Sequence, residues 1–146
     1  MNPDLIALLS ALSARDVRFV IAGAHALAWH GVPRATGDVD VWVEPTPANA
    51  ARLMRALSEF GAPLAGITAD DFTRPGIVFQ VGIAPVRLDI LTDLTGLVFP
   101  EAWARAEPGE LGGVSVRFLS RADLIRNKRA TGRLRDLADV EQLEGD

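Results

Sequence analysis

The sequence has no cysteine and no tyrosine, and its only histidines are His25 and His30. The absence of cysteine excludes disulfide bonds, thiolate-bound zinc, iron–sulfur clusters and thiol catalysis. With two histidines available, a metal site would be built mainly from oxygen ligands, which favours Mg²⁺ or Mn²⁺ over zinc. The absence of tyrosine excludes a reaction in which the chain modifies a tyrosine of its own.

Long hydrophobic runs are also absent. No apolar stretch approaches the roughly 20 residues that span a membrane, and the N-terminal segment lacks the basic region that opens a signal peptide. We therefore expect a cytoplasmic protein without a membrane partner. Over 146 residues there is no internal repeat, low-complexity tract or linker, which predicts one domain over residues 1–146.

Lysine is nearly absent, because Lys128 is the only lysine among 15 basic residues. The 19 acidic residues give a net charge of −4, which argues against a protein that coats nucleic acid. The distribution is uneven, since residues 121–135 carry six basic side chains and one acid. Lys128 therefore lies in a locally basic segment.

Hydrophobic periodicity and turn residues predict a mixed order of helices and strands. Helices are expected at residues 3–14, 24–30, 46–61, 99–105, about 120–131 and 133–144. Strands are expected at residues 18–22, 38–44, 76–82 and 85–92, the last two joined as a hairpin through Ala84-Pro85, and in a hairpin over 110–118. This order predicts an α+β fold, a mixed sheet with helices that ends in two C-terminal helices.

Two aspartates alternate with valines on the clearest predicted strand, DVDVWVE. Asp38 and Asp40 therefore share one face, roughly 6–7 Å apart, while the valines face the core. Asp89 interrupts an otherwise apolar strand, and three carboxylates converge if the two strands are neighbours. Their mutual repulsion calls for cations, and a pair of Mg²⁺ ions suits phosphoryl or nucleotidyl transfer. The alternative is a solvent-facing strand whose acids only add solubility.

Two segments ahead of this aspartate pair offer groups that bind phosphate. The turn Gly23-Ala24-His25 opens a helix with small residues, so that backbone N–H groups can approach a ligand closely. Arg34 and Thr36 lead directly into the aspartates and add side-chain donors. Tight packing at the turn and an ordinary solvated loop are the alternatives.

The run FVIAGAHALAWHGVPRATGDVDVWV resembles the nucleotidyltransferase-fold superfamily, the DNA polymerase β-like group. That group has a small-residue turn opening a helix, Asp-x-Asp on the next strand and a third carboxylate on a later strand. HG-x-x-RAT-x-D-x-D and the ending DLIRNKRATGRLRDLADVEQL look most like small bacterial nucleotidyltransferases related to toxin–antitoxin and abortive-infection systems. The similarity covers nearly the whole chain.

The resemblance implies transfer of a nucleoside monophosphate from an NTP, such as ATP, to a hydroxyl group. Asp38 and Asp40 would hold two Mg²⁺ or Mn²⁺ ions and the triphosphate, and Asp89 would complete the metal site and help to activate the acceptor. An RNA end, a partner protein and a small molecule all remain open as acceptors, as do a toxin–antitoxin partner and an oligomer. The other candidates for nucleotide binding are Gly23, Ala24, His25, Arg34, Thr36 and Lys128.

Several alternatives stay open beside this interpretation. Ala24 stands where the family often has glycine or serine, so no hydroxyl is available there, and the chain is little more than a catalytic core. Both features favour a catalytically inactive, antitoxin-like module that binds a partner. A metal-dependent nuclease is a third hypothesis. Lys128 either contacts the triphosphate or forms ion pairs along the last two helices, and Trp42 either stacks on a base or packs in the core.

Overall fold

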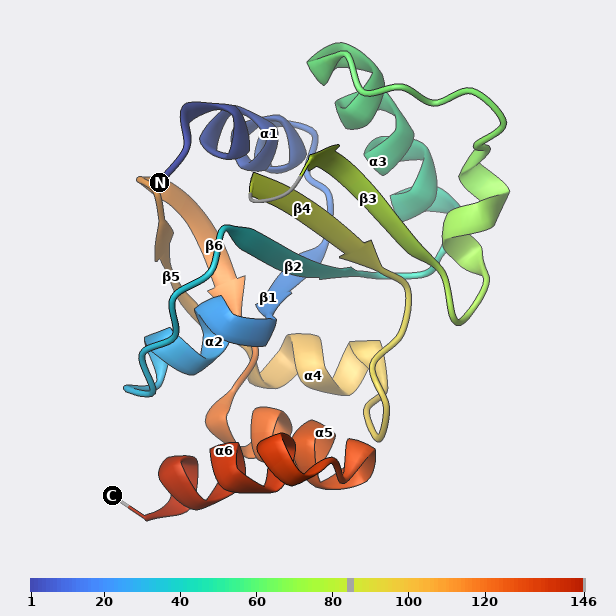
Figure 1. Ribbon diagram of the computed structural model, residues 1–146. Coiled ribbons are helices and arrows are strands. Elements are labelled where there is room, and N and C mark those ends of the chain that lie inside the picture. The colour runs from blue at the N-terminus through green and yellow to red at the C-terminus, as the bar shows by residue number, and fades with distance from the viewer. Residues whose placement is uncertain (84–85, 146) are drawn as a thin grey trace.

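A six-stranded mixed sheet organises the computed structural model, which describes residues 1–83 and 86–145 (Figure 1). The strand order is β3-β4-β2-β1-β6-β5. β2 runs parallel to β4 and antiparallel to β1, and β1 runs parallel to β6. The strands are β1 (Phe19–Ala22), β2 (Asp38–Val43), β3 (Val78–Ile83), β4 (Val86–Leu91), β5 (Glu107–Leu111) and β6 (Val114–Phe118).

Helices cover both faces of this sheet, which confirms the predicted α+β class. α1 and α3 pack on one face together with a short 3₁₀ helix, η1, and α2, α4, α5 and α6 contribute to a second core on the other face (Figure 1). The helices are α1 (Pro3–Ala14), α2 (Gly23–Trp29), α3 (Pro47–Phe60), η1 (Ala69–Thr73), α4 (Phe99–Arg105), α5 (Arg121–Thr131) and α6 (Leu134–Glu144).

Side-chain caps and glycines set the predicted helix boundaries. The Asn2 side chain accepts a hydrogen bond from the Asp4 N–H at 2.8 Å, and Ser120 accepts one from the Asp123 N–H at 3.1 Å. Gly61 and Gly132 close α3 and α5 in the left-handed conformation that glycine adopts without steric cost. The order of helices and strands is therefore as the sequence predicts, because local signals mark nearly every boundary.

Some details differ from the prediction. The short helix η1 was not expected from the sequence. Trp29 is 43% exposed, and one face of its ring stacks on Phe118. The predicted hairpin turn through Ala84-Pro85 lies outside the described residues, although β3 and β4 do pair antiparallel. Within the described ranges, no helix is long and apolar enough to cross a membrane.

Candidate active site

Three carboxylates converge on neighbouring strands, as the sequence predicts. β2 and β4 pair in parallel register, with Asp40 directly opposite Asp89 and Asp38 directly opposite Arg87. Val39 and Val41, between and after the aspartates, are fully buried in the core under α1 and α3. Strand alternation therefore directs the carboxylates to the opposite face, toward α5 and α6.

The turn between β1 and α2 lies directly against Asp40. Ala22 is the cross-strand partner of Asp40, and Gly23 follows with a φ of +61°. A Cβ atom on Gly23 would lie 2.2 Å from the Asp40 Oδ2 atom, well inside van der Waals contact. Glycine is thus needed here both for its backbone conformation and for the space that the carboxylate occupies. The small-residue turn therefore lies beside the aspartate pair, and its predicted role in binding phosphate stays a prediction.

Arg87 bridges two of the three carboxylates. Its Nε donates to Asp89 Oδ1 at 2.8 Å, and its Nη2 lies 3.2 Å from Asp89 Oδ2 and 3.3 Å from Asp38 Oδ2. The hydrogen bond with Asp89 is the main reason why the pKa of Arg87 is raised. Period-two spacing places Arg87 on the face of Asp89, but its bond to Asp38 depends on strand register, which sequence reasoning did not resolve.

Asp40 is the carboxylate left without a counter-charge. Among the described residues it has no ion-pair partner, and burial followed by repulsion from Asp89 and Asp38 raises its pKa to about 6. The charges of Arg87 and Lys128 act in the opposite direction but do not compensate. The site therefore carries an excess of negative charge centred on Asp40.

The donor chemistry fits a hard divalent cation. Carboxylate oxygens are the ligands that Mg²⁺ prefers, and an added cation would relieve the repulsion that raises the pKa of Asp40. In residues 1–83 and 86–145, no three acidic or histidine side chains are already arranged around one ion position. Arg87 instead pairs with both Asp38 and Asp89, so these two carboxylates would have to exchange an arginine for a metal.

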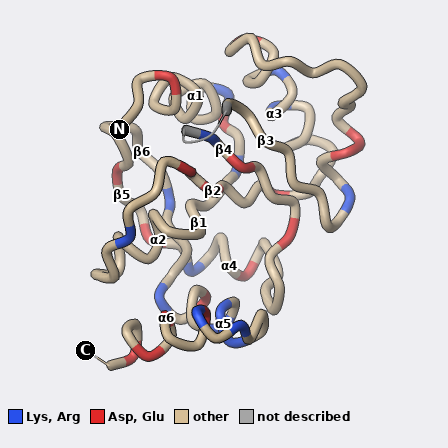
Figure 2. The backbone as a smooth tube through the Cα atoms, in the orientation of Figure 1, with Lys and Arg blue, Asp and Glu red and all other residues tan. Residues whose placement is uncertain are grey.

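A cavity of about 240 Å³ lies between Asp40 and the C-terminal helices. Gly23 and Asp40 line one side, and Lys128 and Arg133 line the other. The predicted metal ligand, the phosphate turn and the lone lysine thus face one space, although 105 residues separate Gly23 from Lys128. Figure 2 shows basic residues gathered on α5, on the side of the sheet that the aspartates face.

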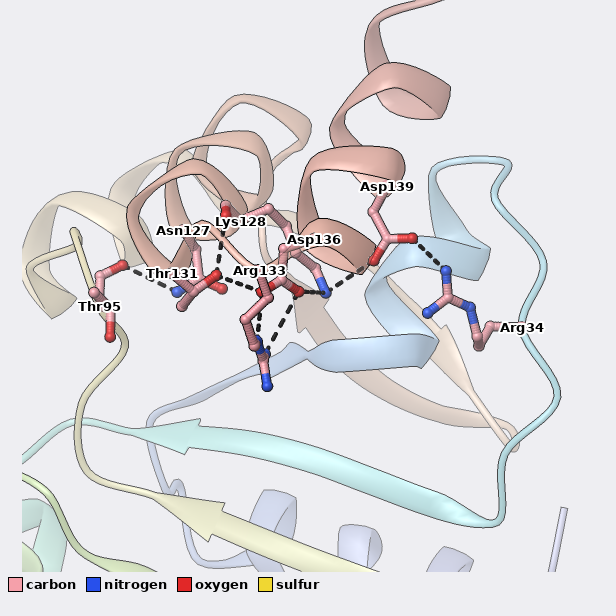
Figure 3. A network of polar contacts seen from close by, with 8 residues as sticks. All are labelled: Arg34, Thr95, Asn127, Lys128, Thr131, Arg133, Asp136 and Asp139. Carbon is pink, nitrogen blue, oxygen red and sulfur yellow. Dashed lines mark hydrogen bonds and ion pairs between the residues drawn. The ribbon is translucent and has the colours of Figure 1, made fainter.

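Two buried aspartates of α6 hold the cations beside this cavity (Figure 3). Lys128 Nζ lies 3.4 Å from Asp136 Oδ1 and 3.2 Å from Asp139 Oδ2. Asp136 also accepts from Arg133 Nε at 2.6 Å and from the Thr131 hydroxyl at 2.8 Å. Burial alone would raise the pKa of Asp136, but these hydrogen bonds and the charge of Lys128 outweigh it and lower the pKa to about 2.

The structure places the remaining predicted residues around the entrance to β2. Thr36 accepts a hydrogen bond from the Asp38 N–H at 3.0 Å and so shapes the turn into the strand. Arg34 does not line the cavity with Gly23, because its guanidinium pairs with Asp139 of α6. Burial lowers the pKa of His25, although a hydrogen bond with the backbone of Asp38 opposes this shift. Ala24, half-buried, follows Gly23 in the first turn of α2.

Trp42 and His30 make contacts that serve the fold. Trp42 is 2% exposed and packs edge-on against Phe99, with 5.1 Å between ring centroids. The ring of His30 hydrogen-bonds with the Leu119 carbonyl oxygen at 2.8 Å. Of the two options for Trp42, the structure favours core packing.

This arrangement agrees with the comparison of the sequence with protein families. The family described as "Nucleotidyl transferase of unknown function (DUF2204)" matches residues 1–144. The chain belongs to this family. It is therefore assigned to the nucleotidyltransferases, as the resemblance of its motifs predicts. No curated protein sequence matches it.

Solved structures show that this nucleotidyltransferase has the fold of known members of the superfamily. A Thermotoga maritima protein proposed to be a nucleotidyltransferase aligns with 97% of this chain and 88% of its own, at 18% identity and a TM-score of 0.59. The lincosamide antibiotic adenylyltransferase LnuA, solved with lincomycin, aligns with 99% of this chain and 96% of its own, at 12% identity and 0.59. The antibiotic-resistance factor ANT(2'')-Ia aligns with 96% of this chain and 80% of its own, at 14% identity and 0.58.

Proposed function

We propose that the protein transfers a nucleoside monophosphate from an NTP to a hydroxyl group of an acceptor. The observation that carries this proposal is the register of β2 and β4, which brings Asp38, Asp40 and Asp89 together beside the Gly23 turn. Nearby, Lys128 and Arg133 line the cavity that Asp40 also lines. Carboxylates for metal and cations for phosphate thus lie on opposite sides of one space.

Each of these residues has its own role in the proposed reaction. Lys128 and Arg133 bind the triphosphate, with lysine acting as a compact charge, and the N–H groups of the Gly23-Ala24-His25 turn approach the phosphates. Asp89 accepts the proton of the acceptor hydroxyl. The acceptor oxygen then bonds to the α-phosphorus, the bond to the bridging oxygen breaks, and pyrophosphate leaves.

Asp38, Asp40 and Asp89 would hold the divalent cations, Mg²⁺ or Mn²⁺. When bound, such ions stabilise the charge on the attacking and leaving oxygens. This chain prepares the site by placing Asp40 against Gly23, where no side chain intervenes, and by keeping the valines of β2 in the core.

Three classes of acceptor offer a hydroxyl group for this reaction. LnuA was solved with the small molecule lincomycin and ANT(2'')-Ia with adenylyl-2''-tobramycin, which supports a small hydroxylated acceptor. An RNA end and a hydroxyl on a partner protein are the other classes, and a protein acceptor would fit a toxin–antitoxin pair.

The test is incubation with each α-labelled NTP and Mg²⁺, in the presence of total RNA, cell lysate or a panel of small hydroxyl compounds. We expect label to move to one acceptor class, and Asp38→Asn or Asp40→Asn to lower the rate at least about 10²-fold. Asp70→Asn is the matched control, because the Asp70 side chain makes exposed contacts far from this site, an ion pair with Arg74 and a hydrogen bond from the Thr73 hydroxyl. Transfer that survives both substitutions would exclude the mechanism.

A second candidate is an inactive transferase fold that binds a partner, as an antitoxin-like component would. The observation in its favour is Arg87, which already pairs with both Asp38 and Asp89. Calorimetry with ATP, GTP, CTP and UTP in Mg²⁺ separates the two functions. Binding of any NTP supports the enzyme, and failure of all four supports the partner-binding module.

A further inference from the structure

Asp139 joins two cations that come from distant parts of the chain. Arg34, in the segment before β2, pairs with one carboxylate oxygen, and Lys128 Nζ of α5 lies 3.2 Å from the other. The Asp139 side chain is 4% exposed and that of Lys128 is 14% exposed, whereas Arg34 approaches from the solvent side with 40% of its side chain exposed. Figure 3 shows Arg34 reaching Asp139 from its loop, with Lys128 between α5 and α6.

The contact between Lys128 and Asp139 is one of charge rather than a well-directed hydrogen bond. The Asp139 Oδ2 atom is buried and receives no aligned hydrogen bond from the residues described. The Lys128 distances of 3.2 and 3.4 Å exceed the roughly 2.7–2.9 Å of a strong charge-assisted bond. Two carboxylates thus hold the Lys128 ammonium group in place, but they do not provide well-aligned acceptors for all of its N–H groups.

The charges of this network do not balance. Arg34, Lys128 and Arg133 contribute three positive charges, and Asp136 and Asp139 contribute two negative charges. Lys128 and Arg133 line the cavity shared with Asp40, and the charge of Lys128 acts on the pKa of Asp40. A polyanionic ligand bound in this cavity would therefore meet both Lys128 and Arg133.

We propose that Asp139 is a positioning residue for the triphosphate, tying the segment before β2 to Lys128. Through Arg34 it fixes the segment that carries Thr36 and leads into Asp38, and through its second oxygen it holds Lys128 at the cavity. Lys128, which we assign to the phosphates, and β2, which carries Asp38 and Asp40, are thereby held at a fixed distance from each other. This inference rests on the proposed function, because it concerns how the same site holds an NTP.

Asp139→Asn tests the tie, since it removes the charge and keeps the shape. We expect NTP binding in Mg²⁺ to weaken about tenfold by calorimetry, the effect of losing one charge-assisted contact, with less than a twofold change for the nucleoside monophosphate. Hydrogen exchange in residues 33–37 should rise in the free protein. The matched control is Glu144→Gln, which breaks the exposed Arg129–Glu144 pair between the same two helices.

A double-mutant cycle separates positioning from general loss of stability. If Asp139 acts through Lys128, the double variant D139N/K128Q should bind NTP less than twofold more weakly than K128Q alone. Arg34→Gln breaks the same tie from its exposed end and serves if D139N does not fold. Equal NTP affinity and equal exchange in D139N and E144Q would overturn the inference while leaving the transferase intact. Failure of the unaltered protein to bind any NTP would overturn both.

Discussion

Asp40 shows how one residue can be placed for function at a cost in stability. It lies against Gly23, faces two other carboxylates and has a pKa of about 6. The nearest arginine, Arg87, pairs with Asp38 and Asp89 instead. A side chain selected only for stability at this position would be neutral, so the charge of Asp40 agrees with the cation-binding role that we propose for it.

Replacing Asp40 by asparagine should therefore stabilise the metal-free protein at neutral pH. The raised pKa means that the fold favours the protonated carboxyl, so this stability is present below about pH 4 and is lost as the pH rises through about 6. Asparagine imitates the protonated form at every pH. We expect a gain of about 1–2 kcal/mol at pH 7.5, after allowance for solvent screening.

Urea unfolding in EDTA at pH 7.5 and pH 4 measures this effect. The advantage of D40N should shrink toward zero at the lower pH. Asp70→Asn replaces an exposed side chain of η1 and should change the free energy of unfolding by no more than about 0.5 kcal/mol at either pH. An asparagine variant no more stable than the original at pH 7.5 would show that Asp40 is not electrostatically strained.

Gly23→Ala should displace Asp40 and weaken metal binding. The added Cβ meets Asp40 Oδ2 at 2.2 Å, and alanine also resists a φ of +61°. Gly31 is a matched control, because its φ is +91° while a Cβ there would meet nothing within 4 Å. Both alanine variants should lose about 1 kcal/mol or more through backbone strain. Only G23A should weaken Mn²⁺ binding, measured by electron paramagnetic resonance; equal binding in both would contradict the role given to Gly23.

The helices α5 and α6 behave as one element because buried aspartates join them. Asp136 is fully buried, yet hydrogen bonds from Arg133 and Thr131 and the charge of Lys128 keep it ionised. The joint is therefore ionic where most helix pairs in a small domain are apolar. Its strength depends on keeping both partners, since removing one leaves a buried charge without compensation.

Asp136→Asn should destabilise the protein by about 2 kcal/mol at pH 7. The pKa of Asp136 is lowered to about 2, so its contribution is present above about pH 4 and is lost as the pH falls through about 2. Urea unfolding from pH 7 down to pH 2 should show the difference between D136N and the original shrinking below pH 4. Glu144→Gln should cost at most about 1 kcal/mol at pH 7, because its pair is exposed. A difference that stays constant with pH would contradict the ionic joint.

At the scale of helices and strands, the sequence predicts the elements themselves but not the contacts between them. Cap residues and alternating valines are local signals, so the helices, the strands and the shared face of Asp38 and Asp40 could be predicted. The bond from Arg87 to Asp38 requires the register of β2 on β4, and the pair between Arg34 and Asp139 joins residues 105 positions apart. No local pattern encodes such long-range geometry, and only placement in the fold revealed it.

Across the whole molecule, the candidate site draws on segments from both ends of the chain. The β1–α2 turn, β2 and β4 supply one side, and α5 with α6 supplies the other. The segment that leads into β2 is joined to α6 by the pair of Arg34 and Asp139 rather than by sheet hydrogen bonds. A nucleotide bound between them would bridge two parts of the structure, so binding should stabilise the entire fold.

Thermal unfolding should therefore report NTP binding as a rise in Tm. At an NTP concentration of 100 times Kd, linkage gives about 2.7 kcal/mol, which corresponds to roughly 5–10 °C for a chain of this length. The rise should need both Mg²⁺ and the NTP, and it should be absent in D38N/D40N because the proposed function assigns the metal to those two carboxylates. K128Q should lose most of the rise with NTP but keep the smaller effect of Mg²⁺ alone, since the proposed mechanism assigns Lys128 to the phosphates and not to the metal. If no NTP raises Tm in the unaltered protein, the site does not bind nucleotide, and the inactive partner-binding module becomes the better account of the fold.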